Sequence, residues 1–223
     1  MTIVCSEEDR LSGLELAPRG NYTVIGNGVD IDYFKAESRT STEFLAPQIL
    51  FTGTFSYAPN QHAVRFFVSE IMPFVKAEIP GAKFVIAGSQ AANLHAQLSA
   101  AGFELESVSD PVDIRPCFRQ ASLFVVPIQS GGGTRLKILE AMAMKVPVVS
   151  TTIGAEGLGV SPGKQLDIAD TPGEFARSCI NLLRNPLRQA TLSQQATTWV
   201  GANYSWDYLC DKVKLLVETA LYA

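Results

Sequence analysis

The stretch LFVVPIQSGGGTRLKILEAMAMKVPVVS, residues 123–150, gives the clearest indication of the fold of this 223-residue chain. Two short apolar runs with β-branched residues, 123–127 and 146–150, flank a glycine-rich loop and a helical segment over 135–144. Short continuous apolar runs are typical of strands that are buried on both faces of a parallel sheet. The stretch therefore predicts a strand, a loop, a helix and a second strand in succession.

The same alternation of strands and helices continues on both sides of this stretch. Strands are predicted from QILFTG, KFVIAG, FELESV and QLDI, residues 48–53, 83–88, 103–108 and 165–168. Helices are predicted over 60–78, 91–101 and 112–120, and successive helices follow residue 171. This order predicts an α/β fold, a Rossmann-like parallel sheet with helices on both faces.

Both ends of the chain carry further elements. TIVC, residues 2–5, predicts a short strand, and Ser6 is the predicted N-cap of a helix that follows it. Residues 22–25 predict another strand before a turn at Asn27-Gly28. The last helix, over 204–221, carries an apolar stripe that we expect this chain to cover only in part. The stripe consists of Leu209, Val213, Leu216 and Ala220.

Composition excludes several classes of function. The chain has 18 basic and 22 acidic side chains, a net charge of −4, and no basic run, so a nucleic-acid partner is not expected. No apolar run approaches the ~18 residues of a membrane span. The first ten residues, MTIVCSEEDR, lack the features of a signal peptide. Four well-separated cysteines predict reduced thiols in a cytoplasmic protein, and two isolated histidines predict no metal site.

The glycine-rich loop and the helix that follows it predict an anion site. The first turn of a helix has unpaired N–H groups and favours anions, yet Arg135 and Lys137 lie there. Glycines allow close backbone approach, so the loop and the helix N-terminus together can bind a diphosphate that the two cations neutralise. The alternative is a flexible loop with two solvated cations. A dinucleotide site is less favoured, because no G-x-G-x-x-G follows a strand.

Glu140 is the one acid of a helix that is otherwise almost entirely apolar. A carboxylate in such surroundings needs partners. One hypothesis pairs Glu140 with Lys137, three residues earlier, although this order of charges is the weaker one on a helix. The other makes Glu140 a bidentate acceptor for two neighbouring sugar hydroxyls. The residues alone leave both open.

The chain resembles a known family over nearly its whole length. GGGTRLKILEAMAMKVPVVSTTIGAEGL, residues 131–158, resembles the donor-binding segment of family 4 glycosyltransferases with the GT-B fold. NGVDIDYF, residues 27–34, is similar to the linker between the two Rossmann-like halves of that fold. The segments ILFTGTFSYAPN, KFVIAG, LFVVP and YSW follow in the family's order and spacing.

The resemblance implies roles for individual residues. The family's pattern is E-x7-E, and Glu140 matches the second Glu, which binds the nucleotide ribose. Gly132 occupies the position of the first, which contacts the donor sugar, so sugar recognition is altered there. The family's diphosphate-binding Arg and Lys fall near Thr54 and Asn60, neither of which is basic. We therefore predict that Arg135 and Lys137 replace that pair and act as the catalytic groups.

The other predicted donor-binding residues surround this clamp. Val112 is expected to pack on the base. The full predicted donor-binding set is Gly53, Thr54, Gly88, Val112, Gly132, Gly133, Thr134 and Glu140. No metal or other cofactor is expected, because the resemblance implies a nucleoside diphosphate sugar as substrate and no metal-binding carboxylate cluster is visible.

The resemblance also implies a domain organisation. Residues 1–26 are expected to be a remnant of an N-terminal acceptor domain, 27–46 the interdomain linker, 47–203 the nucleotide-sugar-binding Rossmann-like domain, and 204–223 a C-terminal crossover helix. The missing acceptor domain is the expected partner. The chain is then expected to be the donor half of a two-domain GT-B enzyme.

The predicted function is transfer of a hexosyl unit from a nucleoside diphosphate sugar to an acceptor hydroxyl, in polysaccharide biosynthesis. Retention of configuration is implied by the family, and the chain is expected to be inactive alone. Three alternatives stay open: a nucleotide-sugar-binding module without catalysis, a GT-B epimerase of UDP-sugars, and a plain α/β interaction domain. The expected location is the cytoplasm, with peripheral docking at the inner face of the membrane left open.

Overall fold

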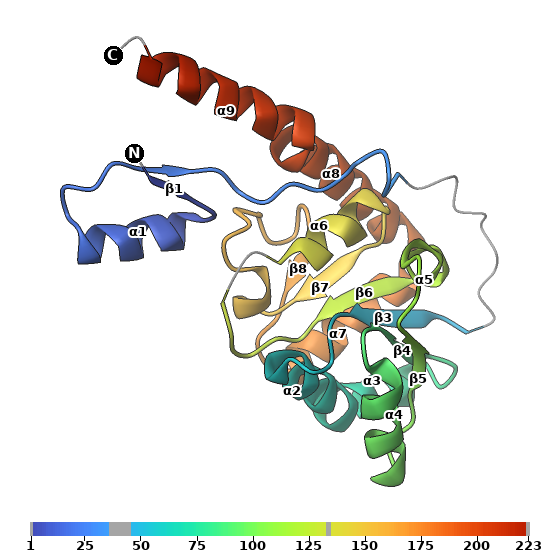
Figure 1. Ribbon diagram of the computed structural model, residues 1–223. Helices are drawn as coiled ribbons and strands as arrows, with labels where there is room; N and C mark the ends of the chain where they lie inside the picture. Colours follow the sequence, from blue (N-terminus) through green and yellow to red (C-terminus); the bar gives the residue numbers. More distant parts are fainter. Residues whose placement is uncertain (1, 36–45, 133–134, 222–223) are drawn as a thin grey trace.

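A computed structural model describes residues 2–35, 46–132 and 135–221 of the chain. The side chains of residues 220 and 221 lie outside this description, as do Gly133 and Thr134 of the predicted site. The described part contains one large parallel sheet, a small N-terminal unit and a long C-terminal helix (Figure 1).

The large sheet confirms the predicted fold class. Its six strands are all parallel and follow the order β5-β4-β3-β6-β7-β8. The strands are β3 (Gln48–Thr52), β4 (Lys83–Gly88), β5 (Glu106–Ser109), β6 (Leu123–Val126), β7 (Val148–Ser150) and β8 (Asp167–Ile168). The predicted apolar runs account for all six.

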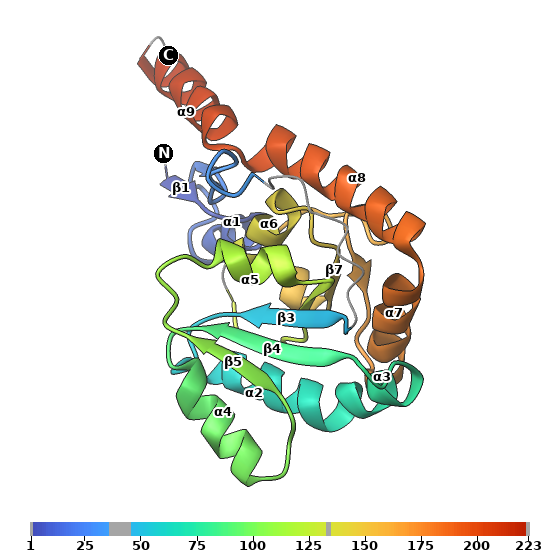
Figure 2. The ribbon, with the colours of Figure 1, turned by 90° about the vertical axis from the view of Figure 1, so that its right-hand side faces the viewer.

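Helices cover both faces of the sheet, as the alternating sequence pattern predicts (Figure 2). One face carries α2 (Ala58–Phe66), α3 (Met72–Glu78) and α4 (Ala91–Ala100). The other carries α5 (Arg115–Gln120), α6 (Leu136–Ala143) and α8 (Pro186–Tyr204), while α7 (Pro172–Arg184) lies beside α3. A short 3-10 helix, Ile153–Ala155, follows β7.

Aromatic side chains fill the core between the sheet and the helices. Phe67 is fully buried, and its ring centroid lies 4.4 Å from that of Phe84 and 6.1 Å from that of Phe175. The three rings pack the end of α2 against β4 and α7. Burial of large apolar side chains is the main favourable term in folding.

Two predicted helices differ in their extent. The helix predicted over 60–78 is interrupted by a π-helical turn at Phe67–Ile71, directly before α3. Pro73 explains the interruption, because proline lacks an N–H and its ring clashes with the carbonyl four residues earlier. The helix predicted from residue 112 begins at Arg115, where the Asp113 carboxylate accepts the Arg115 N–H and Pro116 lies in the first turn.

The N-terminal unit is separate from the large sheet. Strands β1 (Thr2–Val4) and β2 (Tyr22–Val24) pair in parallel and are joined by α1 (Glu7–Leu16). Ser6 is the N-cap of α1, as predicted, since its Oγ accepts the Asp9 N–H at 3.0 Å. The chain then runs back to the main body, where the Val29 N–H donates to the Tyr204 carbonyl at 2.8 Å.

The last helix, α9 (Trp206–Leu221), extends away from the sheet toward the N-terminal unit (Figure 1). Leu209 is buried, but Val213 is exposed, and so are its neighbours Leu215 and Val217. The prediction that this chain covers the apolar stripe only in part is therefore confirmed.

Candidate functional site

A pocket of about 500 Å³ opens at the carboxyl ends of β3, β4 and β5, beside the first turn of α6. This is the edge where ligands bind in open parallel α/β sheets. Five of the predicted site residues line it together, and they come from three separate parts of the sequence. The lining comprises Thr52, Gly53, Thr54, Ala87, Gly88, Ser89, Asp110, Pro111, Ile114, Lys137 and Glu140.

Two glycines in the lining are required by close backbone approach. Gly88 has a φ of +135°, and a Cβ there would collide with the carbonyl of Gly53. A Cβ on Gly53 would lie 2.7 Å from the Nδ2 of Asn60 and 3.1 Å from the Nζ of Lys137. The ends of β3 and β4 can therefore lie this close because Gly88 has no side chain, while Gly53 leaves room for the side chains of Asn60 and Lys137.

Lys137 directs its ammonium group into the site. Its Nζ donates to the Oδ1 of Asn60 at 3.0 Å and lies 4.2 Å from the centroid of the buried Phe51 ring. Asn60 in turn donates from Nδ2 to the carbonyl of Thr54 at 2.9 Å. The side chain of Lys137 is thus fixed over the end of β3 by a hydrogen bond and a cation–π contact.

The surroundings of Lys137 disfavour its charged form. Burial lowers the pKa of this ammonium to about 7, the charge of Arg135 acts in the same direction, and Glu140 opposes both. A half-buried cation of this kind gains from an anionic ligand, because an opposite charge nearby favours the charged form. Perturbed pKa values of this origin are typical of functional sites.

Glu140 lies one turn further along α6, half-buried in the same pocket. Burial raises the pKa of its carboxyl, while Lys137 acts in the opposite direction. Among the described residues, none forms a hydrogen bond or an ion pair within 4.0 Å with this carboxylate. The paired arrangement with Lys137 is therefore not formed in this structure, and the carboxylate is left available to a ligand.

Arg135 differs from Lys137 in its position. It is the N-cap residue of α6 and is buried, and its Nη1 donates to the Gly132 carbonyl at 3.1 Å. Its Nη2 donates to the Gly131 carbonyl. Arg135 does not line the pocket, and its Nε has no partner among the described residues. The guanidinium therefore shapes the glycine-rich loop here, and direct contact with a diphosphate stays a prediction.

Two further predicted residues lie apart from the pocket. The side chain of Val112 is fully exposed, and its neighbours Pro111 and Ile114 supply the apolar wall where Val112 was expected. Gly132 is exposed and has open space around it. The predicted contacts of Gly133 and Thr134 lie outside the described residues.

Asp110 is a lining residue that sequence reasoning missed. Its backbone is left-handed, with a φ of +48°, and Ser109 Oγ donates to its Oδ2 at 2.7 Å. Hydrogen bonds from Ser109 and then Ser89 lower the pKa of this carboxyl. The dipeptide Asp110-Pro111 after a strand is a turn signal, and it was the only hint of this placement.

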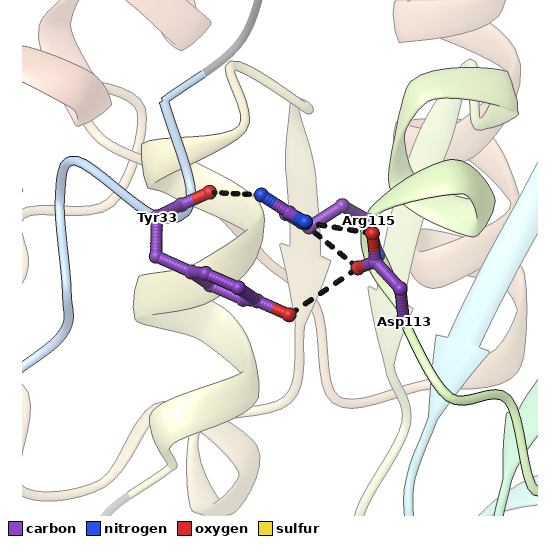
Figure 3. Close-up of polar contacts among 3 residues, drawn as sticks. All are labelled: Tyr33, Asp113 and Arg115. Atoms are coloured by element: carbon purple, nitrogen blue, oxygen red, sulfur yellow. Dashed lines mark hydrogen bonds and ion pairs between the residues drawn. The ribbon is translucent and has the colours of Figure 1, made fainter.

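The loop after β5 is joined to the segment predicted to be the linker through contacts among three residues (Figure 3). Asp113 Oδ1 accepts from the Arg115 N–H at 2.9 Å and from Arg115 Nε at 2.8 Å. The Arg115 guanidinium lies 3.9 Å from the Tyr33 ring centroid and donates from Nη1 to the Tyr33 carbonyl at 3.2 Å. The Tyr33 hydroxyl donates to Asp113 Oδ1 over a longer 3.4 Å.

The described ranges contain neither a candidate membrane span nor a candidate metal centre. No helix there is both long and apolar enough to cross a bilayer. Within the same ranges, His, Cys, Asp and Glu side chains form no group of three or more that could bind a metal ion. The four cysteines are free, and Cys117 and Cys179 are buried.

The fold and the pocket together define an α/β domain with a Rossmann-like parallel sheet and a candidate ligand pocket at the carboxyl ends of its strands. The chain belongs to the family described as glycosyl transferases group 1, whose model matches residues 46–185. The predicted family is therefore confirmed at this level.

Comparison with individual proteins agrees with this assignment. The chain is 29% identical over 163 residues to an uncharacterized 44.6 kDa protein in the cps region of Klebsiella pneumoniae, covering 70% of this chain and 42% of that protein. It is 27% identical over 227 aligned residues to D-inositol 3-phosphate glycosyltransferase of Mycolicibacterium smegmatis, covering 92% and 49%. The chain thus spans less than half the length of both curated relatives.

A solved structure gives the same fold. TarM of S. aureus, in a complex that contains UDP, superposes with a TM-score of 0.76 at 20% identity, covering 96% of this chain and 43% of TarM. At this level of identity the likeness concerns the fold.

Proposed function

We propose that this chain binds a nucleoside diphosphate sugar and supplies the donor half of a glycosyltransferase. The observation that carries the proposal is the meeting of Lys137 and Glu140 in one pocket with the glycine backbones of β3 and β4. The cation suits a diphosphate, and the carboxylate suits the hydroxyls of a ribose. The glycines let the rest of the nucleotide lie close to the backbone. Several structural relatives, TarM among them, were solved with UDP, which supports this class of ligand.

The proposed reaction moves a hexosyl unit to an acceptor hydroxyl with retention of configuration. Negative charge develops on the leaving diphosphate in the transition state. Lys137 and the N-terminus of α6 lie where they stabilise that charge, and such preorganised groups contribute most in sites that exclude water. Arg135 supports the same step by holding the Gly131 and Gly132 carbonyls and so fixing the loop.

The acceptor is proposed to bind to a domain that corresponds to the part of the relatives that this chain does not span. Catalysis requires both reactants in one fixed geometry, and the residues gathered here face a donor only. Residues 1–26 and the exposed face of α9 are proposed to contact that other half. The cps-region relative supports a role in polysaccharide biosynthesis, and the proposed location is the cytoplasm.

A second candidate is a binding module that takes the same donor without turnover. It is favoured by Gly132, which stands where the family resemblance places a sugar-contacting Glu, and which has open space around it. Both candidates require nucleotide affinity, so they differ only in activity.

Calorimetry with UDP, GDP and the corresponding glucose and mannose conjugates tests the proposal. We expect at least one of these ligands to bind, and the sugar conjugate to compete with its nucleotide for one site. Absence of binding by all of them would overturn both candidates. An assay for transfer of labelled sugar by the complete protein then separates the enzyme from the binding module.

A further inference from the structure

The linker segment contacts the loop after β5, which lines one end of the pocket. Tyr33 belongs to the linker, whereas Asp113 and Arg115 lie on either side of Ile114, whose side chain lines the pocket. We call Tyr33, Asp113 and Arg115 the linker clasp (Figure 3). The clasp joins positions that are 80 residues apart in the chain.

The order of the strands indicates which part of a bound nucleotide would lie near the clasp. Lys137 on α6 lies beside the end of β3, and β4 and then β5 follow outward in the sheet. The loop after β5 is therefore at the opposite end of the pocket from the ammonium that meets the diphosphate. Pro111 and Ile114 offer an apolar wall at that end, which suits the face of a base.

Asp110 anchors the start of this loop, because its N–H donates to the Gly88 carbonyl at 3.0 Å, and the part that follows runs along the surface to α5. Asp110 is in a left-handed conformation, Val112 is fully exposed, and α5 begins only at Arg115. Asp113 holds the start of α5, because its carboxylate accepts the Arg115 N–H. Arg115 then carries the connection across to the linker through its stacking on Tyr33 and its bond to the Tyr33 carbonyl.

The linker itself is well placed to hold the loop. Phe34, next to Tyr33, packs edge-on against the buried Phe118 of α5, with ring centroids 6.4 Å apart and an interplanar angle of 87°. Val29 is hydrogen-bonded to the Tyr204 carbonyl at the end of α8. The linker is therefore held by contacts with two helices of the main body, which fix the position of Tyr33.

We propose that Tyr33 is a positioning residue of the donor site, which acts through Arg115 and Asp113 to hold Ile114 against the base. The proposal rests on the proposed function, since it requires that the pocket bind a nucleotide. It makes the linker and the base end of the pocket one unit. Thermodynamic reciprocity then requires that a bound nucleotide also stabilise the docked linker.

The test compares two substitutions of Tyr33 with a matched control. Tyr33→Ala removes the stacking surface and the hydroxyl, whereas Tyr33→Phe keeps the ring over Arg115. Tyr208→Ala is the control, because Tyr208 is 43% exposed and Tyr33 is 42% exposed, and Tyr208 lies on α9 away from the pocket. Calorimetry measures the Kd of UDP, GDP, uridine and guanosine for each variant, well below its melting temperature.

The expected loss concerns the nucleoside part of the ligand. Tyr33→Ala weakens the binding of the nucleoside and of its diphosphate by the same factor, about tenfold, since the stacking and the hydrogen bonds of the clasp are lost. Tyr33→Phe stays within about threefold of the wild type, and Tyr208→Ala does not change either Kd. A merely structural tyrosine would lower the melting temperature and leave these Kd values unchanged.

Other outcomes overturn the inference. Unchanged nucleoside affinity in Tyr33→Ala, or a loss confined to the diphosphate, would contradict a role at the base. If Tyr33→Ala does not fold, the same comparison is made with Arg115→Lys, which keeps a cation beside Asp113 but loses the planar fork that reaches Tyr33. If the wild type binds neither nucleotide, the proposed function fails and this inference fails with it. Binding by the wild type with equal binding by the variants overturns the inference alone.

Discussion

The Nζ of Lys137 lies 3.0 Å from the Oδ1 of Asn60, a residue 77 positions earlier in the chain. Asn60 also donates to the Thr54 carbonyl, so one side chain joins the loop after β3 to the ammonium on α6. Thr54 and Asn60 are the positions at which the family resemblance places its diphosphate-binding Arg and Lys. In this chain a cation reaches the neighbourhood of these two positions from α6 instead.

Lys137→Met is expected to weaken the binding of UDP or GDP far more than that of the nucleoside. The ammonium is proposed to contact phosphate only, and one charge-assisted hydrogen bond contributes ~1.5–3 kcal/mol, or about 10- to 150-fold in affinity. Calorimetry measures both ligands. Lys164→Met, at an exposed lysine outside the pocket, is the matched control. An equal loss for nucleoside and diphosphate would show that Lys137 does not contact phosphate.

Arg135→Ala is expected to act through the loop. The substitution removes two hydrogen bonds to the carbonyls of Gly131 and Gly132, so the ligand-free protein should lose ~1–3 kcal/mol of stability. Affinity for the diphosphate should fall as well, because the loop is no longer fixed. Thermal unfolding without ligand distinguishes this role from direct contact, which predicts a normal melting temperature and a loss of diphosphate binding alone.

The sequence pattern predicted the strands and part of the pocket for a common physical reason. Gly53, Gly88, Lys137 and Glu140 lie directly after apolar runs or on a helix of clear pattern, and the ends of parallel strands meet at one edge. The loop after β5 has no such periodicity, so Asp110 and Ile114 were missed. The direction of a long side chain is also decided by tertiary contacts, which is why Arg135 and Lys137 looked equivalent in sequence and differ in the structure.

Glu140→Gln separates the two hypotheses for this carboxylate. If Glu140 accepts bonds from the ribose hydroxyls, the variant should unfold at the wild-type temperature or slightly above it without ligand, because a half-buried charge is removed. It should also gain less stability from saturating UDP or GDP than the wild type does. Differential scanning fluorimetry with and without nucleotide measures both effects. A much lower melting temperature without ligand would instead indicate a structural pair with Lys137.

Gly88→Ala is expected to destabilise the protein by about 2 kcal/mol or more, since it adds a steric collision to an unfavourable φ. Gly102→Ala is the matched control, because Gly102 also has a positive φ, +88°, but open space around its Cα. The control should cost only about 1 kcal/mol, the part due to backbone conformation. Chemical denaturation measures both variants. Equal losses would mean that the close approach of Gly53 and Gly88 is unimportant.

The ionisation of Lys137 should make donor binding depend on pH. Its pKa is about 7 in the ligand-free protein, where burial disfavours the ammonium. A bound diphosphate favours the charged form and so raises this pKa. Above pH 7 the free lysine is increasingly neutral, and binding must then take up a proton. Affinity should therefore fall by up to tenfold for each pH unit above 7, until the pKa of the bound state is reached.

The same group gives a second, independent signature in stability. The pKa of Lys137 in the folded state lies below the value of about 10.4 that is typical of an unfolded lysine. Between these values the unfolded chain binds more protons, so the free energy of unfolding contributed by Lys137 rises as pH increases from 7 toward 10. Lys137→Met should lack this contribution, and denaturant titrations of both proteins across that range measure the difference.

Proton uptake on binding is measured by calorimetry at pH 8 in two buffers that differ in ionisation enthalpy. At this pH the phosphates of UDP and GDP, with a second pKa of about 6, are fully ionised and add no proton of their own. The wild type should take up close to one proton, and Lys137→Arg, which stays charged at every pH tested, should take up none. Equal uptake by both proteins would assign the proton to another group and remove Lys137 from the diphosphate end of the site.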